Sequence, residues 1–376
     1  MYFLQSISKI ISHTGFTVKR FPVSILGSLF AFVALFLEMH EIGRNAWVVK
    51  NYIYPKLALE GICGISLFIA FDFFVMAKQA EFSKRLGLYL LGFCILGMHF
   101  YSVTPGMFDS ESIFISRFLI FFVCFHLLVS CATFYHKDEI EAFWNYNWFL
   151  FLQFVKSLGF SLSLFIGLGS AVWAVDNLFG MHFQEIYYVD LAAVIFLIFN
   201  TLFFLSNIPR DFSVFKASID YKKSIRIFVQ YVLMPVTLLY MGILYLYFFK
   251  VLMEQRIPNG WICIPILIFA ILGVFTYLLI YPIRESTSNR LFVNYARYFF
   301  YSLLPLLTLY FISIIQRIKP YGITEDRYLI FILGIWMLTM SLYIILSKRD
   351  HIIIIPAGLL TLLALSAIGP WGMFQL

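Results

Sequence analysis

The residues of this 376-residue sequence that could do chemistry are ionisable side chains placed inside long apolar stretches. Four stand out as candidates for a substrate or ion path, namely Lys156, Glu60, Asp72 and His126. Burying a charge at the centre of a bilayer costs about 2.5–3.5 kcal/mol even on insertion scales. Each of these side chains therefore needs a partner, an interface or a function.

Lys156 begins a stripe of small residues along one helix face. Gly159, Ser163, Gly167 and Ala171 follow it at spacings of three or four residues. Such a ladder lets a neighbouring helix approach closely, which predicts that Lys156 points into a bundle. The alternative is that its long side chain reaches the cytoplasmic interface.

The other three candidates also have simpler interpretations. Glu60 lies four residues after Lys56, so the two can pair on one helix face, near the predicted outer surface. Asp72 lies near the opposite end of the same stretch, within reach of Lys78 or the interface. A lone membrane histidine such as His99 or His126 is more commonly a packing residue than a ligand or a proton relay.

A loop near the C-terminus provides a second group of candidates. Its residues Arg317, Tyr321, Thr324, Glu325 and Arg327 could form an outward-facing site. The structural alternative is complete, because Pro320 and Gly322 give a turn and Thr324 is placed as the N-cap of the next helix. The acidic residues that follow Thr324 suit the positive end of the helix dipole.

Common catalytic signatures are absent from the sequence. There is no GxxxxGK loop or GxSxG elbow, and the run His40-Glu41-Ile42-Gly43-Arg44 lacks the second histidine of HExxH. The five cysteines all lie in apolar stretches without a CxxC pair: Cys63, Cys94, Cys124, Cys131 and Cys263. We therefore assign no catalytic residue, metal or cofactor, and the sequence leans against an enzyme.

The elements that position these residues must be membrane helices. Hydrophobic residues make up 62% of the chain and charged residues 12%, with a mean hydropathy of +0.89. The apolar runs are continuous, whereas a barrel would show short alternating segments. The expected fold is an all-α polytopic transmembrane bundle of about 11 helices of roughly 20 residues or more. They fall at 21–39, 52–76, 86–104, 113–134, 144–175, 188–208, 224–250, 261–283, 293–316, 326–347 and 351–371.

Charge and proline distribution suggest the organisation of the chain. Basic residues outside the helices lie mostly on the side that holds the N-terminus, which predicts a cytoplasmic N-terminus. The net charge of +7 therefore reflects residues that orient the protein in the membrane, so we expect no nucleic-acid partner. The expected partners are the lipid bilayer and other membrane proteins. We expect an N-terminal cytoplasmic or interfacial segment, a six-helix half, a basic cytoplasmic linker and a five-helix half, at 1–20, 21–208, 209–225 and 226–376. Before the linker no proline lies deep in a helix, whereas four of the five later helices contain one: Pro235, Pro265, Pro305 and Pro356.

Several motifs in the last half carry a family resemblance. They are Arg256-Ile-Pro-Asn-Gly-Trp261, Tyr281-Pro282, Tyr321-Gly-Ile-Thr-Glu-Asp-Arg327, Trp336 and Gly369-Pro370-Trp371. This part of the chain, from about Tyr221 to Trp371, resembles the bacterial membrane proteins grouped as DUF4153. The resemblance implies a multi-pass architecture in a bacterial inner membrane. It implies no substrate or reaction, because the family is one of unknown function.

Three classes of function remain open. The best supported is transport of a small molecule or ion, given the number of helices, the prolines and the buried charges. The alternatives are a non-transporting envelope-assembly or signalling component, and an integral membrane enzyme acting on a lipid or lipid-linked substrate. A transporter predicts a cavity near the middle of the membrane, whereas an enzyme predicts clustered carboxylates or histidines beside a groove open to lipid.

Overall fold

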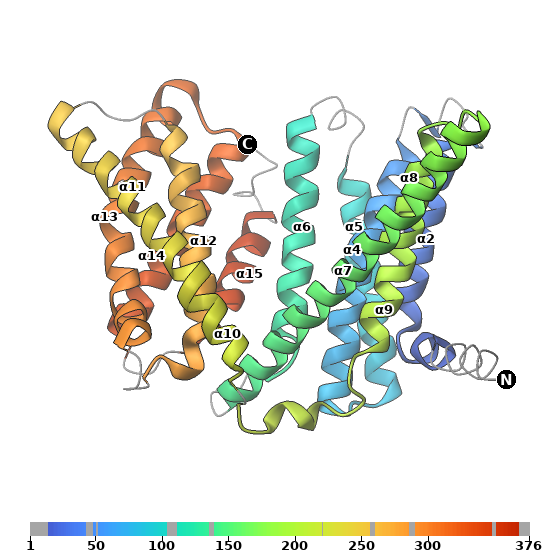
Figure 1. Ribbon diagram of the computed structural model, residues 1–376, viewed down its shortest axis with the longest axis horizontal. Helices are drawn as coiled ribbons and strands as arrows, with labels where there is room; N and C mark the ends of the chain where they lie inside the picture. Colours follow the sequence, from blue (N-terminus) through green and yellow to red (C-terminus); the bar gives the residue numbers. More distant parts are fainter. Residues whose placement is uncertain are drawn as a thin grey trace. The chain divides into compact units, whose positions relative to one another are not determined.

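The computed structural model describes residues 14–42, 48–49, 52–103, 111–134, 139–219, 221–255, 260–285, 290–347 and 351–367. Within these ranges the chain is helical and contains no β-strand, so the predicted all-α fold class is confirmed. The chain divides into two compact units (Figure 1). Unit 1 comprises Met1–Tyr135 and Ala142–Ala217, and unit 2 comprises His136–Glu141 and Ser218–Leu376.

Eight helices of the described chain are long and apolar enough to cross a membrane: Pro22–Met39, Ile53–Lys78, Ile140–Phe179, Ile186–Ser206, Lys223–Glu254, Cys263–Ile283, Arg290–Tyr321 and Glu325–Leu346. Two shorter apolar helices, Ser116–Cys131 and Ile354–Ala367, and α5 (Phe82–Ser102) occupy the remaining predicted stretches. The membrane-protein character predicted from composition is thus supported. The number of about 11 spans and the cytoplasmic N-terminus stay predictions.

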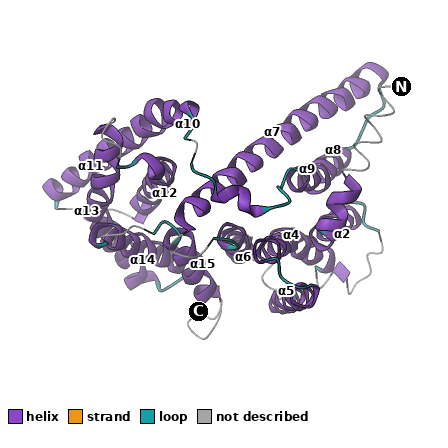
Figure 2. Cartoon of the chain, turned by 90° about the horizontal axis from the view of Figure 1, so that it is seen from below, coloured by secondary structure: helices purple, strands orange, loops and turns teal. Residues whose placement is uncertain are grey.

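Unit 1 is built around α4 (Ile53–Lys78), which packs against α2 (Pro22–Met39), α5 and α6 (Glu111–Cys131), as Figure 2 shows from below. Lipid tails are as apolar as leucine, so membrane helices associate through close packing. At the contact between α2 and α4, a Cβ on Gly61 would come within 2.7 Å of the Cβ of Ala31. Glycine at this position therefore sets how closely these two helices approach.

The remaining helices of unit 1 are α7 (Ile140–Phe179) and a continuous helix formed by α8 (Ile186–Ala193), η3 (Val194–Phe199) and α9 (Asn200–Ser206). With 40 residues, α7 is about 60 Å long, twice the hydrocarbon thickness of a bilayer. The segment η3 is a π-helix inside an otherwise α-helical span, which hydropathy did not predict.

The predicted linker at 209–225 is partly folded onto unit 1. Asp211 caps a short 3₁₀-helix, η4 (Phe212–Lys216), by accepting a hydrogen bond from the Ser213 amide at 2.8 Å. Phe212 and Phe215 of this helix are buried, with ring centroids 5.5 Å from Phe73 and 5.6 Å from Tyr146. These aromatic contacts attach the first half of the segment to unit 1, so only its later residues can act as a linker.

Unit 2 contains α10 (Lys223–Phe228), η5 (Val229–Leu233), α11 (Met234–Glu254), α12 (Cys263–Ile280), α13 (Arg290–Tyr321), α14 (Glu325–Leu346) and α15 (Ile354–Ala367). Two short 3₁₀-helices, η6 (Gly260–Ile262) and η7 (Tyr281–Ile283), flank α12. The core of unit 2 contains the buried side chains of Phe269 and Tyr277 from α12 and of Phe299 and Tyr310 from α13.

The prolines of unit 2 occupy different positions from those expected. Pro265 and Pro356 lie in the first turns of α12 and α15, where a missing amide costs nothing. Of the four, Pro235 and Pro305 lie within long helices; α13 also contains Pro320 near its end, and Pro235 directly follows the π-helical turn η5. The wider π turn offsets the hydrogen bond that Pro235 cannot donate.

Candidate functional site

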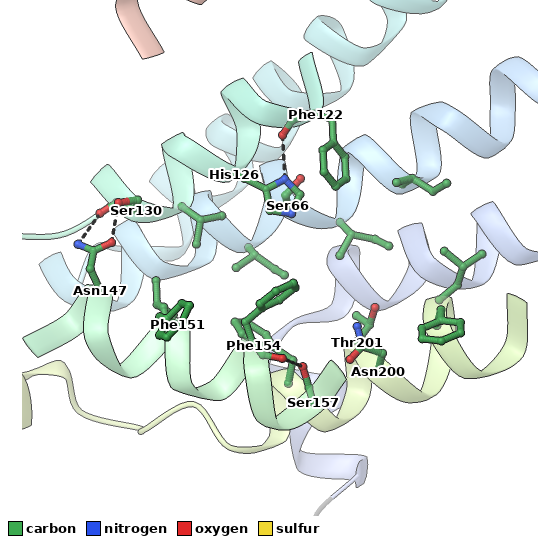
Figure 3. A pocket seen from close by; sticks show the side chains of 18 residues that line it. Ser66, Phe122, His126, Ser130, Asn147, Phe151, Phe154, Ser157, Asn200 and Thr201 are labelled. Carbon is green, nitrogen blue, oxygen red and sulfur yellow. Dashed lines mark hydrogen bonds between the residues drawn. The ribbon is translucent and has the colours of Figure 1, made fainter. Parts of the chain in front are cut away.

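A cavity of about 440 Å³ in unit 1 lies between α4, α6, α7 and the helix that contains η3 and α9 (Figure 3). We call it the central pocket. Eighteen residues line it: Ile62, Ile65, Ser66, Ile69, Phe122, His126, Val129, Ser130, Asn147, Leu150, Phe151, Phe154, Ser157, Phe196, Leu197, Asn200, Thr201 and Phe204. The wall is therefore largely apolar, and hydroxyl, amide and imidazole groups from four helices interrupt it.

Hydrogen bonds fix the polar groups at one end of the central pocket. Ser130 donates to the side-chain oxygen of Asn147 at 2.5 Å, and the Asn147 amide donates to the carbonyls of Ser130 and Phe143. Nδ1 of His126 lies 2.8 Å from the carbonyl of Phe122. Because a carbonyl can only accept, Nδ1 carries the hydrogen, and Nε2 of the neutral ring remains an acceptor.

The buried face of α7 is not the one that the sequence suggested. The side of α7 with Lys156, Gly159, Ser163 and Gly167 is exposed, and apart from the backbone of α7 itself nothing lies within 4 Å of a Cβ built on either glycine. Lys156 is therefore not buried within unit 1, and its role in a polar path stays a prediction. The buried face carries Gln153, Ser157 and Ser161 instead, which also recur every four residues, and Ser161 donates to Asn200 at 3.3 Å.

Glu60 pairs with His99 of α5, a partner that the sequence did not identify. Oε1 of Glu60 lies 2.6 Å from Nδ1 of His99, and the two residues are 7% and 4% exposed. The second carboxylate oxygen and Nε2 of His99 have no hydrogen-bond partner among the described residues. Lys56, also buried, stands over the ring of Phe100 at 5.8 Å.

Asp72 is fully buried and joins α4 to α5 at the other end of the bundle. Its Oδ1 accepts from Arg85 at 2.8–3.0 Å and from the Tyr89 hydroxyl at 2.6 Å. Arg85 also donates to the carbonyl of Arg20, and Arg20 donates to the carbonyls of Ile208 and Pro209. Arg85 is thus the partner of Asp72, where the sequence suggested Lys78 or the interface. This network connects four segments of unit 1: α4, α5, the residues before α2 and the residues after α9.

Burial affects the Arg20 guanidinium, which lies before the first membrane helix. Desolvation, with a further contribution from the positive charge of Arg210, lowers the pKa of Arg20 to about 10. The group therefore stays protonated at neutral pH and keeps its hydrogen bonds to the end of α9.

The predicted outer-loop site is mostly helical. α13 continues to Tyr321, beyond the predicted end at 316, so Arg317 and Tyr321 belong to a helix. Gly322 ends this helix with a φ of 72°, and its backbone amide donates a hydrogen bond to the carbonyl of Ile318. This is the usual role of glycine after a helix. Arg327 donates to the carbonyls of Tyr321 and Gly322.

Thr324 occupies the predicted N-cap position of α14, but its side chain makes no capping hydrogen bond. Glu325 and Asp326 lie in the first turn as expected. These contacts give the segment a structural role.

The metal-ligating side chains are scattered among the described residues. Within them, no group of three or more His, Cys, Asp or Glu side chains could hold a metal ion. The five cysteines are free thiols. Of the four sequence candidates, only His126 lines the central pocket. The polar residues that join it, such as Asn147 and Asn200, were detectable only as isolated amides within apolar stretches.

Comparison with known proteins gives the family and no activity. An uncharacterised Pasteurella multocida protein (strain Pm70), PM1469, is 29% identical over 128 residues, which cover 34% of this chain and 21% of that protein. The chain thus matches about one fifth of the length of this relative, and no solved structure matches it. The family described as "Domain of unknown function (DUF4153)" matches residues 57–375. Since this match extends over most of the sequence, the chain belongs to the DUF4153 family.

Proposed function

We propose that the protein transports a small, uncharged, partly apolar molecule across the membrane and binds it in the central pocket. The observation that carries this proposal is the composition of the wall in Figure 3. It combines aromatic rings with hydroxyl and amide groups, and none of the eighteen lining residues is Asp, Glu, Lys or Arg. A charged solute would lose its hydration there without meeting a counter-charge. The volume of about 440 Å³ lies in the range typical of small-molecule sites.

The π-helix η3 supports the same assignment. Phe196 and Leu197 of this segment line the central pocket, and Asn200 and Thr201 follow directly after it. π-helical turns are rare and concentrate at functional sites, where they change the direction of the next side chains. Among the sequence candidates, His126 belongs to this site, whereas Lys156, Asp72 and the residues near Thr324 have no assigned role in it.

We place this transporter in a bacterial inner membrane, with about 11 spans and a cytoplasmic N-terminus. The excess of basic residues on the N-terminal side supports the orientation. A helix in every predicted apolar stretch supports the number of spans. The bacterial relative from Pasteurella supports the setting.

Accessibility of substituted cysteines tests the proposal. In a background without the five native cysteines, Ser130→Cys and Thr201→Cys place thiols in the central pocket. Ile166→Cys on α7 is the control, because Ile166 is 67% exposed on the outside of unit 1. The measurement is the labelling rate with a small hydrophilic thiol reagent in membrane vesicles of both orientations.

A transporter must admit water to its binding site from each side. We therefore expect both pocket thiols to react from both sides of the membrane, and much faster than the Ile166→Cys thiol. Pocket thiols that stay as unreactive as the control in both vesicle orientations would show a dry pocket, and the transport proposal would be abandoned.

A further inference from the structure

A second hollow lies on a different face of α4, bordered by α2 and α5, with a volume of about 640 Å³. We call it the α2–α5 groove. Its wall is apolar, and four glycines widen it: Gly27, Gly61, Gly64 and Gly97. Its rim is open, since Leu26, Phe30 and Phe93 are 62%, 47% and 56% exposed.

The length of the groove matches one leaflet of a bilayer. Along α4 it extends from Leu57 to Phe68, which corresponds to about 16 Å at 1.5 Å per residue. Half of a hydrocarbon core of roughly 30 Å is about 15 Å. An apolar channel of this length, parallel to a membrane helix and open at its side, suits a single lipid acyl chain.

One end of the groove is polar. Glu60 is the charged residue among those that line it, and it is 7% exposed. His99 occupies one carboxylate oxygen of Glu60, and the other, Oε2, has no partner among the described residues. A carboxylate oxygen left without a donor in an apolar site is costly, so this end of the groove selects a ligand with a hydrogen-bond donor.

Positive charge lies beside this end. Lys56 is one helical turn closer to the start of α4, above the ring of Phe100, which itself lines the groove. A cavity of about 10 Å³ next to Glu60 is lined by Lys56, His99 and Arg117 among others. The end of the groove therefore offers one carboxylate and nearby cations, a combination complementary to a headgroup that carries an ammonium and a phosphate.

We propose that the α2–α5 groove binds a phospholipid with a primary ammonium headgroup. One acyl chain fills the groove, the carboxylate of Glu60 turns its buried Oε2 toward the groove to accept from the ammonium, and the phosphate lies toward Lys56. The groove and the central pocket are on different faces of α4, so this inference does not rest on the transport proposal.

Lipid retention measured by native mass spectrometry tests the inference. The wild-type protein is reconstituted in an equal mixture of phosphatidylethanolamine and phosphatidylglycerol with identical chains, then released with its bound lipid. We expect phosphatidylethanolamine to be retained about tenfold better, the lower value for one charge-assisted hydrogen bond. Glu60→Gln should remove most of this preference.

Gly97→Leu tests occupation of the groove itself. A Cβ added at Gly97 meets nothing within 4 Å, so a leucine side chain starts in open space and extends into the groove, where it takes the space of the chain. The matched control is Gly87→Leu, on the same helix, equally open and outside the groove. Gly97→Leu should lose the bound lipid, and Gly87→Leu should keep it.

Three results would overturn the inference. They are equal retention of both lipids by the wild type, an unchanged preference in Glu60→Gln, and equal retention in Gly97→Leu and Gly87→Leu. If Gly97→Leu does not fold, Val33→Phe narrows the groove from α2 and takes its place, with the same expected loss of lipid.

Discussion

Replacing Asp72 with asparagine removes the negative charge that joins α4 to α5. The carboxylate is fully buried and accepts from both Arg85 and Tyr89. Asparagine has nearly the same shape and keeps one acceptor oxygen. The substitution therefore tests the charge and leaves the packing almost unchanged.

The expected cost follows from the exposure of the partner. Breaking a fully buried ion pair costs about 3–5 kcal/mol, because one charge stays buried and uncompensated. The Arg85 side chain is 24% exposed, so solvent recovers part of this loss. Hydrogen bonds to charged groups contribute about 1.5–3 kcal/mol, and asparagine retains some of this interaction. We expect Asp72→Asn to lower the free energy of unfolding by about 2–3 kcal/mol.

Equilibrium unfolding in mixed detergent micelles measures this change, with a double-mutant cycle of Asp72→Asn and Arg85→Met to isolate the pair. The control is Lys250→Met, which removes an exposed pair with Glu254 at 3.8 Å and should cost less than about 0.5 kcal/mol. A loss in Asp72→Asn no larger than in the control, together with no coupling in the cycle, would refute the reasoning.

Two further predictions concern packing and pH. Gly273→Ala should lower the free energy of unfolding by about 1–3 kcal/mol, because the added Cβ would come within 1.9 Å of the Phe299 ring. The control Gly242→Ala adds its Cβ in open space and should be neutral or stabilising. Equal effects of the two substitutions would contradict this prediction. Hydrogen bonds from Ser213 lower the pKa of Asp211, so its contribution to stability is present at neutral pH and is lost as the pH falls through that lowered pKa. Hydrogen exchange at the Ser213 amide should therefore speed up in acid relative to the same amide in Asp211→Asn, because asparagine keeps a cap and does not titrate. Parallel pH profiles of the two proteins would count against the prediction.

The apolar stretches predicted most of the helical structure, because long continuous hydrophobic runs allow little else in a membrane. They did not predict the two π-helices. An apolar span has the same hydrophobic pattern whether each amide donates its hydrogen bond to the carbonyl four or five residues earlier. The fold of Phe212–Lys216 onto unit 1 was also missed. Its two phenylalanines lie between basic residues, and a local pattern does not reveal the distant aromatic rings that bury them.

The site was predicted less well than the helices. His126 was identified as a candidate, but the stripe that begins at Lys156 is exposed in unit 1, and the buried face of α7 carries a second stripe of polar residues. Spacing alone cannot say which stripe is buried. Glu60 and His99 lie at similar depths on predicted neighbouring helices, and this match of depth was a usable signal for their pairing.

The π-helix η3 also sets the rotational phase of everything that follows it. Successive residues of an α-helix are turned by about 100° around its axis. Removing one residue from Val194–Phe199 would restore regular α-helix and rotate Asn200 and Thr201 by that angle, out of the central pocket. The rest of the span would keep its length and its hydropathy. The part of the polar wall that α9 contributes thus depends on a single extra residue in the helix, and a change invisible to hydropathy could replace that part with another.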